Sequence, residues 1–212
     1  LPFNDKTFSN SNPSLSRDGK TLYFSSNRPG SIGGVDIWKV AISETGSYGT
    51  PENLGNKVNS EGNESFPFIT SENVLYFSSD AKQGIGAMDV YKINLNSDSE
   101  AKNLGKPVNS EKDDFAFSFN ENKKIGFVAS NRNENDDIFQ LLPVCNYEVN
   151  TIVINAITGA ILAEANVSIL DDKNNIISTK KSKEGEFLPV LAGAASQYFG
   201  EGDIGVCGLG MY

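Results

Sequence analysis

The chain has 212 residues, of which 38% are hydrophobic and 21% charged, a composition typical of one or two globular domains with a buried core. Its 18 Lys and Arg residues against 27 Asp and Glu residues give a formal net charge of −9. Because phosphate binding needs a basic surface, this balance argues against nucleic acid as a partner. The chain has no His, which excludes a Ser-His-Asp triad, a Cys-His dyad and a His-ligated metal site within it.

One segment of the chain occurs three times, at 12–40, at 65–93 and, more loosely, at 114–139. The Asp36 of its Asp-Ile-Trp motif returns 53 residues later as Asp89 and 48 residues after that as Asp137. A second marker, Asn-Leu-Gly followed by Val-Asn-Ser, recurs with an offset of 50 residues, at 53–60 and 103–110. Two independent markers with a period near 50 indicate a repeat architecture.

Each repeat predicts short antiparallel strands, because Gly, Asn, Asp or Pro interrupts runs rich in Tyr, Phe, Val, Ile and Ser. In the first repeat, Asp18-Gly19 is a hairpin turn that makes partners of Pro13–Ser16 and Thr21–Ser25. A third strand begins at Asp36, and Glu52–Leu54 is the expected fourth. Four strands per repeat indicate a propeller blade, and the chain is therefore predicted to be all-β.

The segments Pro13–Arg28 and Gly33–Trp38 resemble the Pro-Asp repeats of TolB-like, WD-repeat-like β-propellers. They are similar to the version found in outer-membrane-associated, OmpA-family proteins of Bacteroidetes-type bacteria, including PorE-like components of the type IX secretion system. The third repeat departs from the pattern, with Glu121-Asn-Lys-Lys in place of the Asp-Gly turn and Gly126 where the others have Leu. The resemblance implies three four-stranded blades within residues 1–144.

Three blades are fewer than the four to eight or so that usually close a propeller ring. The chain also opens on Leu1, and it contains neither a leader pattern nor an apolar run near 18 residues. We therefore expect a fragment of a longer protein, in which residues 1–11 are a polar linker or the tail of a preceding blade. The unpaired strand edges of such a fragment should promote self-association.

After Leu142 the repeat stops, and the pattern becomes that of a small β-sandwich. Thr158-Gly159, Ala165-Asn-Val167 and Gly185-Glu-Phe187 resemble the carboxypeptidase-regulatory-like domain, an immunoglobulin-like sandwich. We assign residues 145–187 to an incomplete domain of this kind and leave the Gly-rich tail 188–212 unassigned. In the OmpA-family proteins this sandwich follows the propeller and precedes a peptidoglycan-binding domain, which this chain lacks.

Three segments suggest ligand sites but have simpler interpretations. The Gly-rich loops at Pro29–Gly34 and Gly84–Gly86 could cradle a phosphate, yet neither opens a helix, so we interpret them as tight strand connections. The stretch Asn131–Asp137 resembles the start of a calcium loop, but it lacks the Gly at position six and the Glu at position twelve.

The repeated acidic and aromatic positions are expected to be structural. Each repeated Asp stands at a strand start just after a loop, so a side-chain bond to nearby backbone N–H groups is favoured over a ring of carboxylates. Aromatic residues at one repeated position indicate blade packing rather than a ligand platform. The positions are Asp36, Asp89 and Asp137, and Trp38, Tyr91 and Phe139.

No motif for covalent or acid–base catalysis emerges. A Gly-x-Ser-x-Gly elbow is absent, and the Ser-x-x-Lys matches at 99–102 and 178–181 stand in polar stretches without companion motifs. The adjacent carboxylates Asp113-Asp114 and Asp136-Asp137 would point to opposite faces of a strand. Cys145 and Cys207 can form a disulfide in an oxidising compartment or remain unpaired packing residues. We predict no catalytic, cofactor-binding or metal-binding residue, and no cofactor.

Two classes of function are consistent with these features. The favoured one is a non-catalytic protein-binding or scaffold module of the bacterial periplasm or outer membrane, with envelope proteins as partners and a peptidoglycan link through a domain outside this chain. The alternative is an accessory propeller and sandwich region of a secreted hydrolase or peptidase. In either case the loops at the blade ends are expected to carry the affinity, although the sequence does not indicate which loop.

Overall fold

The computed structural model describes residues 1–170, 174–183, 188–194 and 207–211, and all its regular elements are β-strands. The all-β prediction is therefore confirmed over these residues. The chain forms two compact units, the first built on Leu1–Leu142 and the second on Pro143–Gly210. No helix within the described ranges is long and apolar enough to cross a membrane.

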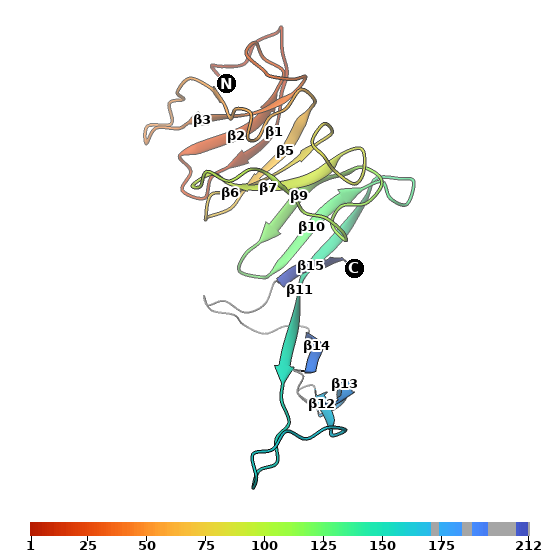
Figure 1. Ribbon diagram of the computed structural model, residues 1–212. Helices are drawn as coiled ribbons and strands as arrows, with labels where there is room; N and C mark the ends of the chain where they lie inside the picture. Colours follow the sequence, from red (N-terminus) through yellow and green to blue (C-terminus); the bar gives the residue numbers. More distant parts are fainter. Residues whose placement is uncertain (171–173, 184–187, 195–206, 212) are drawn as a thin grey trace. The chain divides into compact units, whose positions relative to one another are not determined.

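The first repeat forms an antiparallel sheet of four strands in sequence order (Figure 1): β1 (Asn10–Leu15), β2 (Thr21–Ser26), β3 (Asp36–Ala41) and β4 (Glu52–Asn53). The predicted turn joins β1 to β2. Gly19 has a φ of 71°, which Gly adopts without strain, and the Asp18 carboxylate accepts hydrogen bonds from the Ser16 hydroxyl and the Lys20 N–H.

The second repeat forms the same sheet again, with β5 (Glu64–Ile69), β6 (Val74–Ser79), β7 (Asp89–Asn94) and β8 (Lys102–Asn103) in order. The pairings of the two sheets are equivalent: Phe24 lies opposite Trp38 in the first, and Phe77 lies opposite Tyr91 in the second. Residues at equivalent positions of the two sequence repeats therefore occupy the same register in the two sheets.

The third repeat supplies three strands, β9 (Asp114–Asn120), β10 (Ile125–Ser130) and the first part of β11 (Asp137–Thr151). No Asn-Leu-Gly marker follows Asp137, and within the described residues no strand equivalent to β4 or β8 directly follows β11. Two strands from the end of the chain pair with β11: β15 (Cys207–Met211), and β14 (Leu188–Ala194), whose partners are Cys145–Thr151 in the second unit. The tail that the sequence left unassigned thus contains strands.

Successive sheets of the first unit pack face to face. Tyr23 and Ile37 of the first sheet form a buried cluster with Leu75, Phe77 and Tyr91 of the second. The second and third sheets meet through the stacked rings of Tyr76 and Phe117, whose centroids are 4.3 Å apart. The aromatic positions Trp38 and Tyr91 are buried, which confirms their packing role.

In the first unit, the first strand of each sheet carries a bulge at its third residue, where the pairing register with the second strand shifts and the backbone φ is positive. The residues are Asn12, Phe66 and Ala116, with φ between 49° and 55°. Pro follows the bulge in the first two repeats, as Pro13 and Pro67, where the break in the ladder needs no N–H donor.

The second unit contains the hairpin of β12 (Asn166–Leu170) and β13 (Ile176–Lys181), and the antiparallel pair of β11 and β14. The predicted turn at Thr158-Gly159 is present, because Gly159 has a φ of 69° and its N–H bonds to the Asn155 carbonyl. The Gly185-Glu-Phe187 motif lies outside the described residues. The assignment to a sandwich stays a prediction.

Candidate binding surface

The Asp36 and Asp89 side chains accept hydrogen bonds from the backbone of the Gly-rich loops that precede them. The Asp36 carboxylate accepts hydrogen bonds from the backbone N–H groups of Ile32 (2.6 Å) and Gly33 (3.2 Å), and Asp89 accepts the equivalent bonds from Ile85 and Gly86. The prediction for the repeated Asp is confirmed at these two positions. Since the loop N–H groups already have acceptors, the interpretation of the loops as strand connections is favoured over a phosphate site.

The Asn residues of the second marker complete the same network. Asn53 donates to Asp36 (2.6 Å), while Asn59 bonds both the N–H (2.7 Å) and the C=O (3.0 Å) of Ile37. The second repeat reproduces these bonds with Asn103, Asn109, Asp89 and Val90. The Asp-Ile-Trp motif and the Asn-Leu-Gly marker therefore belong to one hydrogen-bond network, which connects the third strand of the sheet to the loop that follows the fourth strand.

Glycine lets these loops approach the next sheet closely. A Cβ on Gly33 would lie 2.3 Å from the Gly62 carbonyl oxygen, and one on Gly86 would lie 2.1 Å from the Lys112 carbonyl oxygen. Both distances are far below a normal contact, so only Gly fits at these positions. The Gly34 N–H donates to the same Gly62 oxygen at 2.8 Å.

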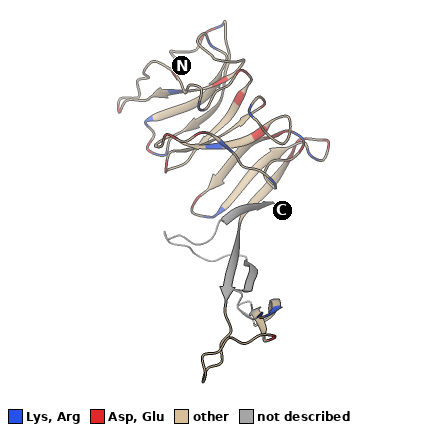
Figure 2. Ribbon diagram, in the orientation of Figure 1, with Lys and Arg blue, Asp and Glu red and all other residues tan. Residues whose placement is uncertain are grey.

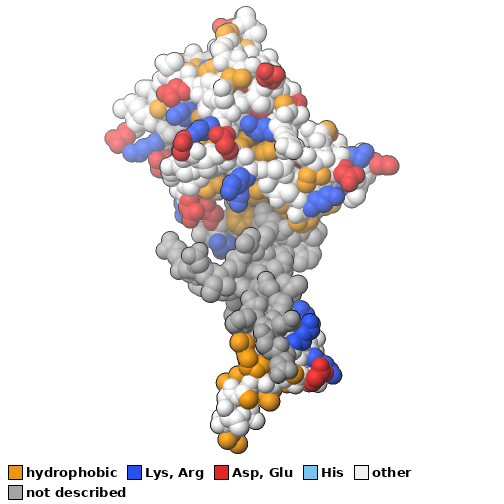
Figure 3. All heavy atoms as spheres, viewed as in Figure 1, with side chains coloured by type: hydrophobic (Ala, Val, Ile, Leu, Met, Phe, Trp, Pro, Cys, Tyr) orange, Lys and Arg blue, Asp and Glu red, His pale blue; other side chains and the backbone are white. Residues whose placement is uncertain are grey.

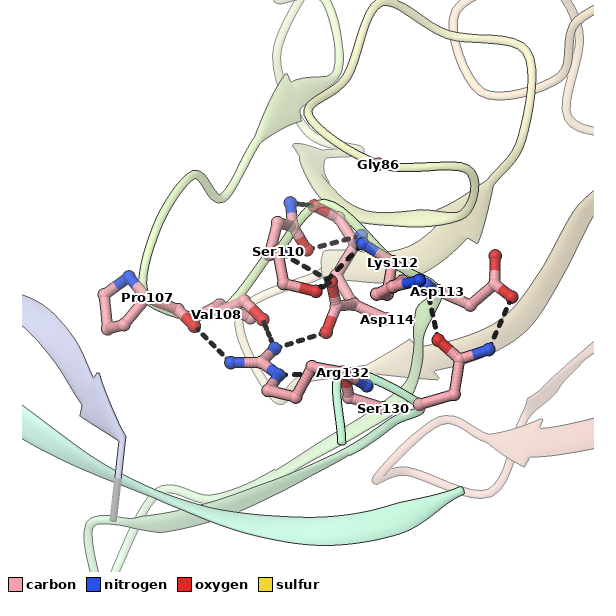
Figure 4. A network of polar contacts seen from close by, with 12 residues as sticks. Gly86, Pro107, Val108, Ser110, Lys112, Asp113, Asp114, Ser130 and Arg132 are labelled. Carbon is pink, nitrogen blue, oxygen red and sulfur yellow. Dashed lines mark hydrogen bonds and ion pairs between the residues drawn. The ribbon is translucent and has the colours of Figure 1, made fainter. Parts of the chain in front are cut away.

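A buried ion pair lies at the start of the third sheet (Figure 4). The Asp114 side chain is fully buried and accepts hydrogen bonds from the N–H and the hydroxyl of Ser110. Arg132 pairs with this carboxylate and donates to the carbonyls of Pro107 (3.0 Å) and Val108 (2.7 Å). Its guanidinium also lies 4.9 Å from the ring centroid of Phe139.

At the positions of Arg132 and Asp114, the first two repeats do not have an Arg–Asp pair. Arg28 donates to the Asn10 side chain (2.9 Å) and the Phe3 carbonyl (3.2 Å), and its guanidinium lies within 5.5 Å of four aromatic ring centroids. In the second repeat Ala81 replaces the Arg, and the buried Glu64 is held by the hydroxyls of Ser60 and Ser79.

Sequence reasoning missed this group, although the repeated Asn-Arg at 27–28 and 131–132 was a usable signal. Residues 1–11, expected to be a polar linker or the tail of a preceding blade, contact the first sheet: Phe3 stacks on Phe24 with ring centroids 5.3 Å apart. The two aromatic residues of this segment, Phe3 and Phe8, both face the Arg28 guanidinium. Most of the buried polar side chains at this loop end of the sheets are bonded to one another, which favours a structural role for the network.

The other end of the first unit carries the turns that join the first two strands of each sheet. We call it the turn end. A hollow of about 220 Å³ there is lined by residues from the turn regions of all three sheets. Its apolar lining includes Leu15, which is 55% exposed, together with Phe68 and Phe119. Arg17 and Ser71 also line it.

Glu121, which lines this hollow, interacts with two other polar residues of the lining, Ser71 and Arg17. It accepts a hydrogen bond from the Ser71 hydroxyl (2.5 Å), and its carboxylate lies 3.8 Å from the Arg17 guanidinium. A larger hollow of about 730 Å³ shares Arg17 and Ser71 and extends to Tyr23 and Lys39. Burial raises the pKa of the Tyr23 phenol above its usual range. The turn end thus offers apolar contacts beside both signs of charge.

Charge is mixed over the first unit. Figure 2 shows acidic and basic residues interspersed along its loops and strand ends, and the face in Figure 3 shows both signs side by side. Within the described residues, no group of three or more His, Cys, Asp or Glu side chains could hold a metal ion.

The remaining sequence candidates do not come together at either end. Asp137 is exposed and, within the described part of the chain, makes none of the loop bonds of Asp36 and Asp89, because its preceding loop is three residues shorter and lacks Gly. This corrects the prediction for the third Asp. The Asn131 side chain, at the start of the suspected calcium loop, is bonded to Asp113. The adjacent carboxylates Asp113 and Asp114 have different hydrogen-bond partners, in agreement with the prediction that they point to opposite faces of the strand.

Three further sequence candidates are the two Ser-x-x-Lys matches and the cysteine pair. The Ser99 hydroxyl is bonded to that of Ser97 (2.7 Å) rather than to Lys102. The side chains of Ser178, Cys145 and Cys207 lie outside the described residues, so the disulfide stays an open prediction.

Comparison with known proteins leaves the family open. No protein-family model and no curated protein matches the chain. Among solved structures it is similar to TolB from Acinetobacter baumannii, with 15% sequence identity and a TM-score of 0.46. The similarity covers 86% of this chain and 46% of TolB, so the chain spans about half the length of that protein.

Proposed function

We propose that the chain is a non-catalytic protein-binding module, and that the turn end of its first unit is the binding surface. The observation that carries this proposal is the hollow to which three successive sheets each contribute a turn. Rigid strands hold these turns, an arrangement that suits recognition rather than chemistry. The loop end is the weaker candidate, because its polar side chains are already paired internally.

The chemistry of the hollow suits a protein partner. At about 220 Å³ the smaller hollow can receive one apolar side chain, while the adjoining hollow of about 730 Å³ falls within the 300–1,000 Å³ or so typical of small-molecule sites. Exposed Leu15 would contact that side chain, while Arg17 and Glu121 offer a donor and an acceptor beside it. No pair of carboxylates lines either hollow in an arrangement suited to acid–base work.

The setting we propose is the bacterial cell envelope. The resemblance of the repeats to TolB-like propellers of OmpA-family proteins supports it, as does the order of propeller and sandwich along the chain. In this proposal the first unit binds envelope proteins in the periplasm, and the second is a spacer related to the carboxypeptidase-regulatory-like domain. A link to peptidoglycan would come from a domain outside this chain.

Photo-crosslinking tests the surface directly. A benzophenone amino acid at Leu15 should crosslink a defined envelope protein in cells that express the full-length protein. The matched control is Glu134, an exposed residue at the loop end. Arg17→Glu should reduce the crosslink from position 15 at unchanged protein level. Equal crosslinking from both positions, or crosslinking only from position 134, would contradict the proposed surface.

The full-length reading frame and the location of the protein separate this proposal from the hydrolase alternative. An OmpA-type domain downstream and fractionation with the envelope support the scaffold role. A hydrolase domain in the same frame, or hydrolysis of peptide, ester or glycoside substrates by the purified chain, would overturn it.

A further inference from the structure

The larger hollow of the turn end lies between the first two sheets, each of which supplies part of its lining. Its apolar residues are Tyr23, Leu54 and Leu95, which belong to or pack against the buried cluster between these sheets. Most of the remaining lining is polar and neutral, and comes from Ser16, Thr21, Thr70, Ser71, Asn73 and Asn96. At about 730 Å³, this hollow has the volume of a small-molecule site.

A difference between the repeats leaves space at this point. Between the second and third sheets, the ring of Tyr76 stacks on that of Phe117, with the two centroids 4.3 Å apart. Tyr23 has the position of Tyr76 in the first sheet, since each lies opposite a Lys of the third strand. The residue equivalent to Phe117 in the second sheet is Pro67, because each directly follows the bulge of its strand. Pro is smaller than Phe and has no aromatic ring, so the space beside Tyr23 is less completely filled.

The hydroxyl of Tyr23 has no hydrogen-bond partner within the described part of the chain. The Tyr23 side chain lines the hollow and is only 6% exposed. Burial and, to a smaller extent, the charge of Asp18 raise the pKa of this phenol. Because Asp18 also lines the hollow, its influence places the hydroxyl toward the turn that borders it. A polar group in so buried a side chain normally has a partner, and a ligand in the hollow can supply one.

Two more neutral groups of the lining have unused hydrogen-bonding capacity. No described residue forms a hydrogen bond with the Thr21 hydroxyl. Asn73 donates to the Asn96 side chain at 3.1 Å, and no described donor bonds the Asn73 amide oxygen. Together with Tyr23, these residues offer a ligand two hydroxyls, each able to donate and to accept, and one further acceptor.

The charged residues of the lining, by contrast, have partners within the chain. The Lys39 ammonium lies 3.3 Å from the Glu52 carboxylate, and the Arg17 guanidinium lies 3.8 Å from that of Glu121. The Asp18 carboxylate accepts hydrogen bonds within its own turn. A ligand with a net charge would have to compete with these pairs, whereas a neutral ligand would use only the free hydroxyl and amide groups.

We propose that the larger hollow binds a neutral saccharide. Sugar hydroxyl groups both donate and accept hydrogen bonds, as the free hydroxyls of Thr21 and Tyr23 do. The C–H groups on the face of a sugar ring are apolar and match Leu54 and Leu95. The residues with free groups, Thr21, Tyr23 and Asn73, do not line the smaller hollow. This site therefore goes beyond the proposed protein-binding surface, and either proposal can fail while the other stands.

Saturation-transfer NMR on the purified 212-residue chain tests the proposal with trisaccharides of similar size. Maltotriose and cellotriose are neutral, whereas trigalacturonate carries a carboxylate on every ring. We expect saturation transfer to at least one neutral sugar, with a Kd of the order of 1 mM, which corresponds to a few neutral hydrogen bonds. Trigalacturonate should bind more weakly, by about 5-fold or more, because its carboxylates would lose hydration without gaining a free cation.

Two substitutions that each remove one hydroxyl locate the site. Tyr23→Phe and Thr21→Val should each weaken binding about 5-fold, the effect of one neutral hydrogen bond. Both variants should fold, because other repeats have Phe127 and Val74 at the equivalent positions, and circular dichroism checks this. The matched control, Tyr76→Phe, removes a Tyr hydroxyl at the equivalent position of the second sheet, outside the lining, and should leave the Kd unchanged.

Three results would overturn the proposal. The first is the failure of both neutral sugars to bind, and the second is equal or tighter binding of trigalacturonate. The third is a Kd for Tyr23→Phe and Thr21→Val that equals the Kd of the Tyr76→Phe control.

Discussion

Replacing Gly33 by Ala tests the close approach of the Gly-rich loop to the next sheet. The added Cβ would lie 2.3 Å from the Gly62 oxygen and 2.4 Å from the Ser60 oxygen, whereas real Cβ contacts are rarely shorter than 3.0 Å. The backbone must therefore move by about 0.7 Å, the difference between 3.0 and 2.3 Å, which disturbs the Gly34 hydrogen bond to Gly62. Overpacking costs about 1–3 kcal/mol and a weakened hydrogen bond about 1 kcal/mol more.

We expect Gly33→Ala to lower the free energy of unfolding by about 2–4 kcal/mol, a large part of the total for a typical domain. Urea unfolding followed by the fluorescence of Trp38, the single Trp, should show a midpoint lower by at least about 1 M. The control is Gly49→Ala, where the nearest atom would be 3.7 Å away and the effect should stay within about 0.5 kcal/mol. Equal midpoints for the two variants would refute the packing argument.

Three further predictions concern other parts of the first unit. Asp89→Asn should lower the free energy of unfolding by about 1–3 kcal/mol, because an amide nitrogen would face the N–H donors that now bond the carboxylate. The control, Asp137→Asn, should change it little. Equal shifts of the thermal midpoint in the two variants would contradict a structural role for the network. Arg132→Met should lower the free energy of unfolding by about 3–5 kcal/mol, because the buried Asp114 carboxylate would lose its cation. Lys181→Met, which removes an exposed ion pair, should lower it little. Chemical denaturation of both variants measures the difference. Since burial raises the pKa of Tyr23, the native state keeps this proton above pH 10, where the unfolded chain loses it. The contribution of Tyr23 to stability should therefore be fully present below pH 10 and be lost as pH rises above it, so the alkaline loss of stability should be less steep in Tyr23→Phe.

Local pattern in the sequence was enough to predict the repeats, the strands of the first two repeats and the first hairpin, but not the strands of the tail. Asp18-Gly19 specifies its turn through backbone conformation and short-range hydrogen bonds, which need no distant partner. The backbone bonds of Asp36 and Asp89 were predictable for the same reason, because donor and acceptor lie within four residues. The third Asp failed because its loop had changed length, and the local geometry changed with it.

Tertiary structure decided what depends on residues far apart in the chain. The pairing of Arg132 with Asp114 spans 18 residues and a strand connection, and the repeated Asn-Arg marks the position of the Arg without identifying its partner. The hollow at the turn end exists only because successive sheets stack and place three turns side by side. The exposure of Ile138 likewise follows from the order of the sheets: it shares its position with the buried Ile37, and the difference is whether another sheet of the unit covers it. Sequence thus determined each sheet through local contacts, while packing between sheets determined which surfaces remain available for binding.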